Sequence, residues 1–353
     1  MRRFNIIISE RNGSVIEETP LADYNIVRDI LTPVKSVAVL PYISTAKRGN
    51  LVTIYNPQYY IGYYTRDVHE GYISDIVYGK GITTLYILPI EAMLNTNIHY
   101  STVGLDTNLQ TWVGNMIKSV INTNPDGSMN FFYSVVYNTS TTVVGADLGL
   151  TSNIFNPFSL LKLILLKYGL LVKLVLLDTK TVQITISDIS STSSLIELNN
   201  PNVYKYNLDF STNMLNKIIY INSDDESEKL YYFLASDGTV SGNGGYLRIL
   251  PVIQDTVFYK PETSFSTETA ILANTALKIS EENFLIEIEG GERNLLSNSI
   301  PFLRFCTKYK IKHNDTIYTG TLTAYEVLTD ETVRLTFGAV RADLTTLLGL
   351  ERR

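Results

Sequence analysis

Short runs of β-branched and aromatic residues, each bounded by turn residues, fill the first hundred residues of this chain. NLVTIYN at 50–56 and TTLYILP at 83–89 are typical of them. Runs of this length and spacing predict the strands of a barrel or sandwich. The 24 Tyr against a single Trp point the same way, because Tyr is enriched in strands. We therefore predict an α+β, mainly β fold, and a length of 353 residues predicts two to four domains.

The two ends of the chain carry similar patterns. TTLYILPIEAML at 83–94 and TVRLTFGAVRADLTTLL at 332–348 both read as an alternating strand followed by a short helix. Earlier in each end, YYIGYYT at 59–65 and IYTGTLT at 317–323 share a glycine and a threonine at matching positions. We predict two similar small β-barrel domains, each closed by a short helix that covers the mouth of the barrel.

The middle of the chain reads as mixed α and β structure. A helix is predicted over 106–121, with Asp106 or Thr107 as its N-cap. The apolar block at 158–178 is interrupted by three lysines, so it is too broken for a membrane span. It predicts instead a buried helix with Asn156 as cap and Gly169 as stop, followed by a hairpin across 178–180.

Two stretches of this sequence resemble a known family. They are NLVTIYNPQYYIGYYT at 50–65 and YKIKHNDTIYTGTLTAYEVLTDETVRLTFGAVRADLTTLL at 309–348. Both resemble the phage tail hub proteins, the siphophage tail-associated (Tal) proteins, which are similar to the central baseplate hub of T-even phages. No catalytic residue is part of the shared motif.

The resemblance implies four domains. Two are tube-type β-barrels, at 1–100 and at 196–233 plus 292–345. Two are outer domains, an α+β domain at 101–195 and an insertion at 234–291 plus 346–353. Three subunits with two similar domains each would build a ring of six near-equivalent positions.

The same resemblance implies a location and partners. It implies a homotrimer at the virion tail tip, assembled in the bacterial host cytoplasm, that closes the tail tube and contacts the distal tail or tail-tube ring protein. The tape-measure protein is a further expected partner. DNA would pass through the central channel without sequence-specific binding. The formal net charge of −6 and the lack of a basic block also argue against sequence reading.

The candidate chemistry is sparse, and we predict neither a cofactor nor a metal site nor an enzyme. His69, His99 and His313 are far apart in sequence, so we expect each to be exposed or hydrogen-bonded. Cys306 admits two interpretations, a nucleophile paired with a histidine or a packed thiol. The acidic stretch 223–228 reads as a calcium loop or as a solvated turn between two strands.

Aromatic residues favour a contact function instead, because Tyr adds buried area at low entropic cost. The candidate assembly-surface residues are Tyr59, Tyr60, Gly62, Tyr63, Tyr64, Thr65, Gly320 and Thr323. The alternative function is a receptor- or glycan-binding module of a phage baseplate. That alternative requires an exposed aromatic pocket in one of the outer domains.

Overall fold

The computed structural model describes residues 4–30, 32–55, 69–122, 133–137, 143–146, 148, 150, 152–176, 181–210, 216–235, 239–242, 254–261, 264–281, 284–291, 305–328 and 332–338. Its helices are η2 (Ile90–Leu94, a short 3₁₀ helix), α1 (Leu109–Asn122), α2 (Pro157–Tyr168) and α3 (Phe265–Glu281). Its strands up to the middle of the chain are β1 (Asn5–Ser9), β2 (Val15–Pro20), β3 (Asp23–Asp29), β4 (Ser36–Leu40), β5 (Leu51–Tyr55), β6 (His69–Tyr78), β7 (Thr83–Pro89), β8 (Ile98–His99), β9 (Tyr133–Tyr137), β10 (Ile154–Phe155) and β11 (Leu170–Leu176). The later strands are β12 (Val182–Asp188), β13 (Ser190–Glu197), β14 (Val203–Phe210), β15 (Lys217–Asn222), β16 (Lys229–Leu234), β17 (Val240–Ser241), β18 (Gln254–Tyr259), β19 (Phe284–Gly291), β20 (Thr307–His313), β21 (Thr316–Leu328) and β22 (Thr332–Gly338).

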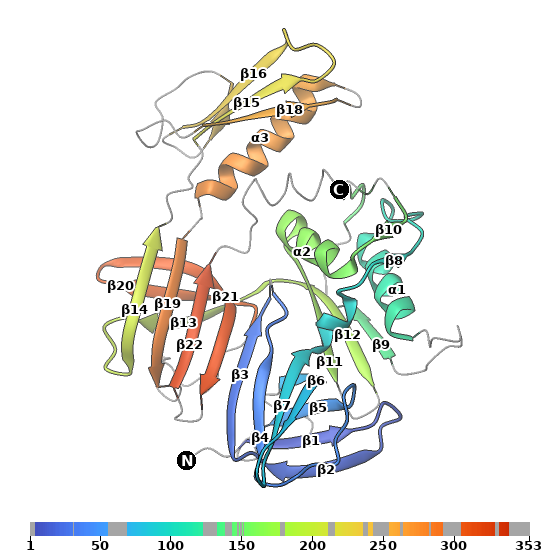
Figure 1. Cartoon of the computed structure of the whole chain (residues 1–353). Helices are drawn as coiled ribbons and strands as arrows, with labels where there is room; N and C mark the ends of the chain where they lie inside the picture. Colours follow the sequence, from blue (N-terminus) through green and yellow to red (C-terminus); the bar gives the residue numbers. More distant parts are fainter. Residues whose placement is uncertain are drawn as a thin grey trace. The chain divides into compact units, whose positions relative to one another are not determined.

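The fold is mainly β, as the sequence predicts, and most strands belong to one curled sheet (Figure 1). Its strands follow the order β14-β19-β22-β21-β3-β4-β7-β6-β5-β1-β2, and β20 pairs with both β21 and β13. We name β1–β7 the first arm of this sheet. The second arm is β13, β14 and β19–β22. The first arm comes from one of the two ends that carry similar sequence patterns, and β21 and β22 of the second arm come from the other.

The two arms meet where β3 pairs with β21. The strands are antiparallel, with Asp29 opposite Ala324 and Asn25 opposite Leu328. A side-chain hydrogen bond supports the register, because Asn25 Nδ2 donates to Glu326 Oε1 at 2.8 Å. Asn25 and Glu326, which are 301 positions apart, therefore help to join strands from both ends of the chain into one sheet.

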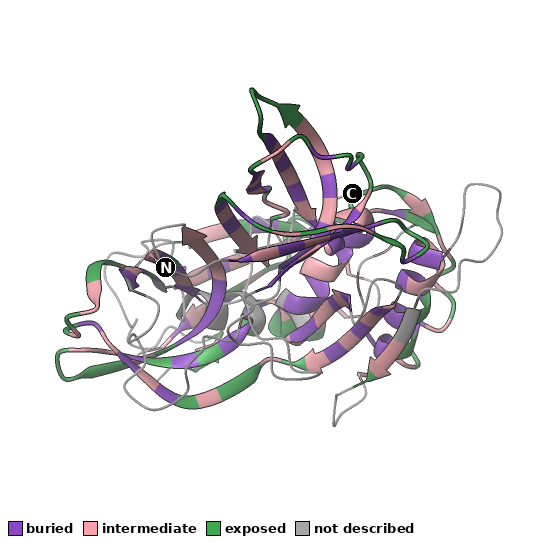
Figure 2. Cartoon of the chain, turned by 90° about the horizontal axis from the view of Figure 1, so that it is seen from below, coloured by how far each residue is buried: buried purple, intermediate pink, exposed green. Residues whose placement is uncertain are grey.

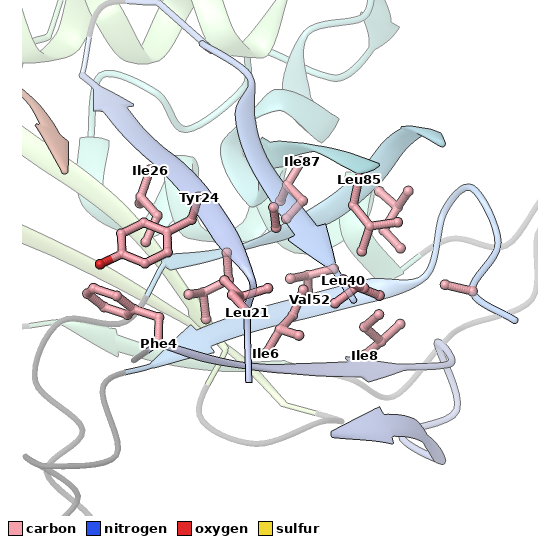
Figure 3. Packing of buried hydrophobic residues seen from close by; sticks show 14 residues of the cluster. Phe4, Ile6, Ile8, Leu21, Tyr24, Ile26, Leu40, Val52, Leu85 and Ile87 are labelled. Carbon is pink, nitrogen blue, oxygen red and sulfur yellow. The ribbon is translucent and has the colours of Figure 1, made fainter. Parts of the chain in front are cut away.

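Alternating apolar residues build the core of the first arm. Ile6 and Ile8 on β1 are fully buried, and so are Leu85 and Ile87 on β7. Successive side chains of a strand point to opposite faces, so every second residue enters the interior. Figure 3 shows these side chains gathered inside the arm, and Figure 2 shows the buried bands that alternate along the strands. Each fully buried side chain of this size contributes about 1.5–3 kcal/mol to folding.

The three-stranded sheet β11-β12-β9 packs with α1 and α2. β11 and β12 form the predicted antiparallel hairpin. α2 has both predicted caps, because the side chain of Asn156 accepts the Ser159 N–H at 3.0 Å and Gly169 ends the helix at φ 68°. That positive φ is strained for any residue with a Cβ, which explains the glycine.

The N-cap of α1 differs from the prediction. The cap is Asn108, whose Oδ1 accepts the Thr111 N–H at 2.9 Å, and not Asp106 or Thr107. Three successive residues that all favour N-caps precede this helix, so propensity alone does not choose among them. The helix begins at Leu109, whose side chain is fully buried, and this start makes Asn108 the cap.

The chain divides into two compact units, and each is described by itself. Unit 1 draws on Met1–Tyr206 and Glu287–Val340, and unit 2 draws on Asn207–Ile286 and Arg341–Arg353. Unit 2 contains a four-stranded sheet in the order β17-β16-β15-β18. α3 packs on this sheet around the buried side chains of Ile218, Tyr220, Val257, Ala273 and Leu277.

The repeated end patterns are confirmed in part. TTLYILPIEAML forms β7 followed by η2, and the strand at the start of the second pattern is β22. The helix predicted over the end of the second pattern lies outside the described residues. The four-domain division stays a prediction. The strands at 217–222 and 229–234, which that division places in the second tube-type domain, pair with β18 and β17 in unit 2.

The apolar block at 158–178 forms most of α2 and then β11, which is the predicted helix followed by a strand. Among the described helices, none combines the length and the apolar character that crossing a bilayer requires.

Candidate functional site

The structure describes two of the eight predicted assembly residues. The six at 59–65 lie outside the described residues. Gly320 and Thr323 lie on β21, where Gly320 is buried opposite Tyr309 of β20. Thr323 is 8% exposed, and its Oγ1 donates to the carbonyl oxygen of Thr336 at 3.1 Å. Both are thus part of the interior of the chain, and their role in an assembly surface stays a prediction.

A buried cluster of charges lies elsewhere in unit 1. We name it the polar junction and define it by Arg28, Glu70, Glu91, Lys173 and Cys306. These residues come from β3, β6, η2, β11 and the segment just before β20. The junction therefore connects the first arm, the second arm and the sheet that carries β11. Buried charges are costly unless they are paired, so each partner in this cluster matters.

Arg28 is the central cation of the junction. Its Nη2 lies 3.0 Å from Glu91 Oε1, and its side chain is 10% exposed. The guanidinium also stacks over the ring of Phe305, with the central carbon 5.3 Å from the ring centroid. Burial alone would lower the pKa of Arg28, but the surrounding negative groups, Glu91 foremost, together raise it above its usual value. The side chain therefore stays a cation that ties β3 to η2 and to the second arm.

Glu70 connects the first arm to β11. Its Oε2 accepts the backbone N–H of Leu176 at 2.7 Å, and the residue is 5% exposed. Burial raises the pKa of this carboxyl to about 7, and the hydrogen bond and Arg28 lower it by less. Glu70 thus changes charge near neutral pH while it holds two separate strands together.

His69 corrects one prediction from the sequence. It is 1% exposed, and neither ring nitrogen has a hydrogen-bond partner within the part of the chain that the structure describes. Burial and the nearby Arg28 lower its pKa to about 3, so the ring is neutral. The expectation is confirmed for the other two histidines, since His99 is exposed and His313 Nε2 lies 3.4 Å from Tyr206 Oη.

A cavity of about 50 Å³ opens beside the junction. Arg28, Glu91 and Lys173 line it on the polar side, and Phe158 and Phe305 line it on the apolar side. Burial lowers the pKa of Lys173. Within the described ranges, Glu91 Oε2 has no hydrogen-bond partner. The wall of the cavity is mostly apolar with a few charged groups, and the volume is large enough for a few water molecules.

Cys306 fits the interpretation as a packed thiol. Burial raises the pKa of its thiol to about 12. A cysteine nucleophile acts as the thiolate, so this environment opposes nucleophilic chemistry. The residue instead packs beside Leu165 and Leu171, and its backbone N–H donates to the carbonyl oxygen of Leu322 at 3.0 Å.

The polar junction is therefore a structural tie between segments that are distant in sequence. Sequence reasoning missed it, although one signal was present. Lys173 interrupts the apolar run of β11, and a charged residue inside a buried strand needs a partner. The other members follow from pairings that the sequence alone does not reveal.

The acidic stretch at 223–228 is a turn between β15 and β16, as one of its two interpretations predicts. Asp225 Oδ1 accepts hydrogen bonds from the backbone N–H of Ser227 at 3.0 Å and from its hydroxyl at 2.6 Å. Asp224 pairs with Lys260 at 3.2 Å. These carboxylates are thus engaged by groups of the same unit.

Comparison with known proteins decides what kind of fold this is. The sequence matches no family model, and no curated protein matches it. The structure, however, is similar to the 43 kDa tail protein of prophage MuSo2 from Shewanella oneidensis, with a TM-score of 0.59, 12% identity and coverage of 96% of this chain and 98% of that chain. The chain has the fold of a phage tail protein.

Two further structures agree with this assignment. The tail protein from Neisseria meningitidis MC58 has a TM-score of 0.59 and 12% identity, covering 97% of each chain. A chain of the phage P2 baseplate in its activated conformation with Ca has a TM-score of 0.52 and 14% identity, covering 96% of this chain and 99% of that chain. The resemblance inferred from the sequence is therefore confirmed for the fold.

Proposed function

We propose that this chain is the structural hub at the distal end of a phage or phage-derived tail. In this proposal three copies form a ring that closes the tail tube and frames the channel for DNA ejection. The observation that carries the proposal is the extent of the fold similarity, because it spans 96% of this chain and 98% of the MuSo2 tail protein. A tail role in turn locates the protein at the virion tail tip.

The large sheet supports self-association. β2 and β14 end the strand order, and within the described part of the chain each has a single neighbouring strand. Val15 on β2 is 54% exposed and Tyr204 on β14 is 64% exposed. An open sheet edge presents unpaired backbone groups that pair readily with another chain. Three copies with two arms each then place six arms around one axis.

The charge of the chain supports a channel that DNA crosses without stalling. The chain has 29 Lys and Arg against 35 Asp and Glu. Fixed cations that face the bore would bind phosphates, so we expect few Lys and Arg there. The further partners in this proposal are the distal tail or tail-tube ring protein above the ring and the tape-measure protein in its channel.

The mass of the assembly in solution tests the proposal. Three subunits of 39.7 kDa each form a particle of about 119 kDa, and light scattering coupled to size exclusion measures it. Val15→Lys adds a charge at the edge strand, so it shifts the particle toward the monomer. The control is Val103→Lys, since Val103 is 87% exposed and lies outside the sheet. A wild-type chain that stays monomeric at high concentration would overturn the trimer.

The role is structural and not enzymatic in this proposal. The high thiol pKa of Cys306 supports that, as do the descriptions of the similar structures as tail and baseplate proteins. The second candidate is a receptor- or glycan-binding module of a baseplate. One observation favours a binding surface of that kind: in unit 2 the side chains of Tyr231 and Phe258 are 43% and 54% exposed.

A further inference from the structure

The four-stranded sheet of unit 2 has two different faces. α3 packs on one of them (Figure 1), where Tyr232 Oη lies 3.0 Å from Thr269 Oγ1 of the helix. Alternation along the strands turns the remaining residues to the opposite side, which we name the outer face. Strand pairing arranges it in three rows: Phe233, Lys217 and Gln254; Tyr231, Ile219 and Thr256; Lys229, Ile221 and Phe258.

The outer face exposes aromatic rings to solvent. Tyr231 is 43% exposed and Phe258 is 54% exposed. These rings lie on either side of the central strand β15, which contributes the half-buried Ile219 and Ile221. Clustered exposed apolar residues with a polar rim mark sites where something binds.

Lys217 gives this face a charge preference. Its Nζ lies 5.7 Å from the centroid of the Tyr231 ring and 5.8 Å from that of Phe233. In the part of the chain described here, no carboxylate pairs with it. The nine positions of the face hold two lysines and no acidic residue, although the whole chain has a net charge of −6. The acidic turn 223–228 adjoins the row of Ile221 and Lys229. The opposite end of the face, at Lys217, is thus the part that is complementary to an anion.

The size of the outer face limits the ligand. Three strands about 4.8 Å apart and five residues at about 3.3 Å each define an area of about 10 by 13 Å, which is about the footprint of two or three sugar rings. A stable protein interface needs roughly 20–30 residues on each side, whereas this face has nine. A second copy of the chain or a folded protein therefore fits poorly.

We propose that the outer face of unit 2 binds an anionic oligosaccharide. The C–H faces of its sugar rings pack on Tyr231 and Phe258, and its carboxylate or phosphate pairs with Lys217. Gln254 and Thr256 are placed at the rim to hydrogen-bond hydroxyl groups. A peptide is less suited, because peptides add to sheet edges or lie in grooves, and this is the flat face of a sheet. The inference is independent of the trimeric hub role.

Isothermal titration of the full chain with trigalacturonic acid tests this site. Maltotriose is the neutral probe and hexaglutamate is the acidic peptide probe. We expect the wild type to bind the acidic sugar more tightly than either, and added salt to weaken that binding. Phe258→Ala weakens binding of the acidic sugar at least about tenfold. Lys217→Gln removes the preference for the acidic sugar over the neutral one.

The matched control is Tyr78→Ala, which removes a tyrosine that is 55% exposed at the end of β6 in unit 1. This variant should bind as the wild type does. Circular dichroism confirms that each variant is folded. The proposal is overturned if trigalacturonic acid does not bind, if Phe258→Ala and Tyr78→Ala bind equally, or if hexaglutamate is preferred. Each of these readouts is separate from the mass of the assembly, so the site and the trimer can fail independently.

Discussion

The carboxyl of Glu70 makes the stability of unit 1 depend on pH in a calculable way. Its pKa rises from the ordinary 4.5 to about 7 on folding, so between these values the folded chain holds a proton that the unfolded chain releases. The contribution of Glu70 to the free energy of unfolding is therefore largest below pH 4.5 and is lost as the pH rises through 7. At about 1.4 kcal/mol for each tenfold change in proton affinity, the loss is about 3 kcal/mol.

Glu70→Gln isolates this effect. The amide does not titrate, and its carbonyl oxygen still accepts the Leu176 N–H. The free energy of unfolding of the variant, relative to wild type, should rise by about 3 kcal/mol between pH 4.5 and pH 8. The difference between the two proteins is needed because His69 opposes the trend. The pKa of His69 is lowered from 6.5 to about 3 on folding. Its contribution to the free energy of unfolding therefore falls as the pH falls from 6.5 to 3, and it does so in both proteins.

Urea unfolding at a series of pH values measures the difference. Trp112 is the single Trp of the chain, and it is 5% exposed on α1, so its fluorescence reports on unit 1. Glu197→Gln is the control, because the Glu197 side chain is 47% exposed beside Lys312 and should change stability by less than about 1 kcal/mol at any pH. If the Glu70→Gln difference stays constant within about 0.5 kcal/mol across this range, the account of the buried carboxyl is wrong.

Three further predictions concern the same unit. Arg28→Met leaves Glu91 buried without its partner and should lower the free energy of unfolding by about 3 kcal/mol or more, whereas Lys312→Met, at an exposed pair, should lower it by less than about 1 kcal/mol. Asn156→Ala removes the N-cap of α2 and should lower the free energy of unfolding by about 1 kcal/mol. Cys306 should resist a thiol reagent at pH 8 in the folded chain and react fully in urea.

Each of these has a clear contrary result. Equal effects of Arg28→Met and Lys312→Met in urea unfolding would show that burial does not strengthen the ion pair. An unchanged midpoint in Asn156→Ala would mean that the Ser159 N–H finds another acceptor. Reaction of Cys306 in the native chain at the rate of a free thiol would contradict its burial.

Local structure was predictable from the sequence because local residues determine it. The caps of α2 at Asn156 and Gly169, the hairpin of β11 and β12, and the strand of 83–89 each depend on a few neighbouring residues. The cap of α1 shows the limit, because neighbouring residues offered three equivalent choices.

Long-range structure was not predictable in the same way. The pairing of β3 with β21 joins residues about 300 positions apart, and strand alternation is equally compatible with other partners. The polar junction depends on that pairing, since it brings Arg28 to Phe305. The burial of His69 likewise depends on what packs over β6, which periodicity does not reveal.

The polar junction also fits the proposed mechanical role. A buried ion pair is a weak source of net stability, because desolvation offsets most of the attraction. It does penalise misplaced partners, since any shift of β3, η2 or β11 would leave a charge buried and unpaired. In the proposed ring, one allowed arrangement of the two arms would matter more than extra stability. The charges of Arg28 and Glu91 thus select the arrangement, and the apolar core of the first arm supplies the energy that keeps it folded.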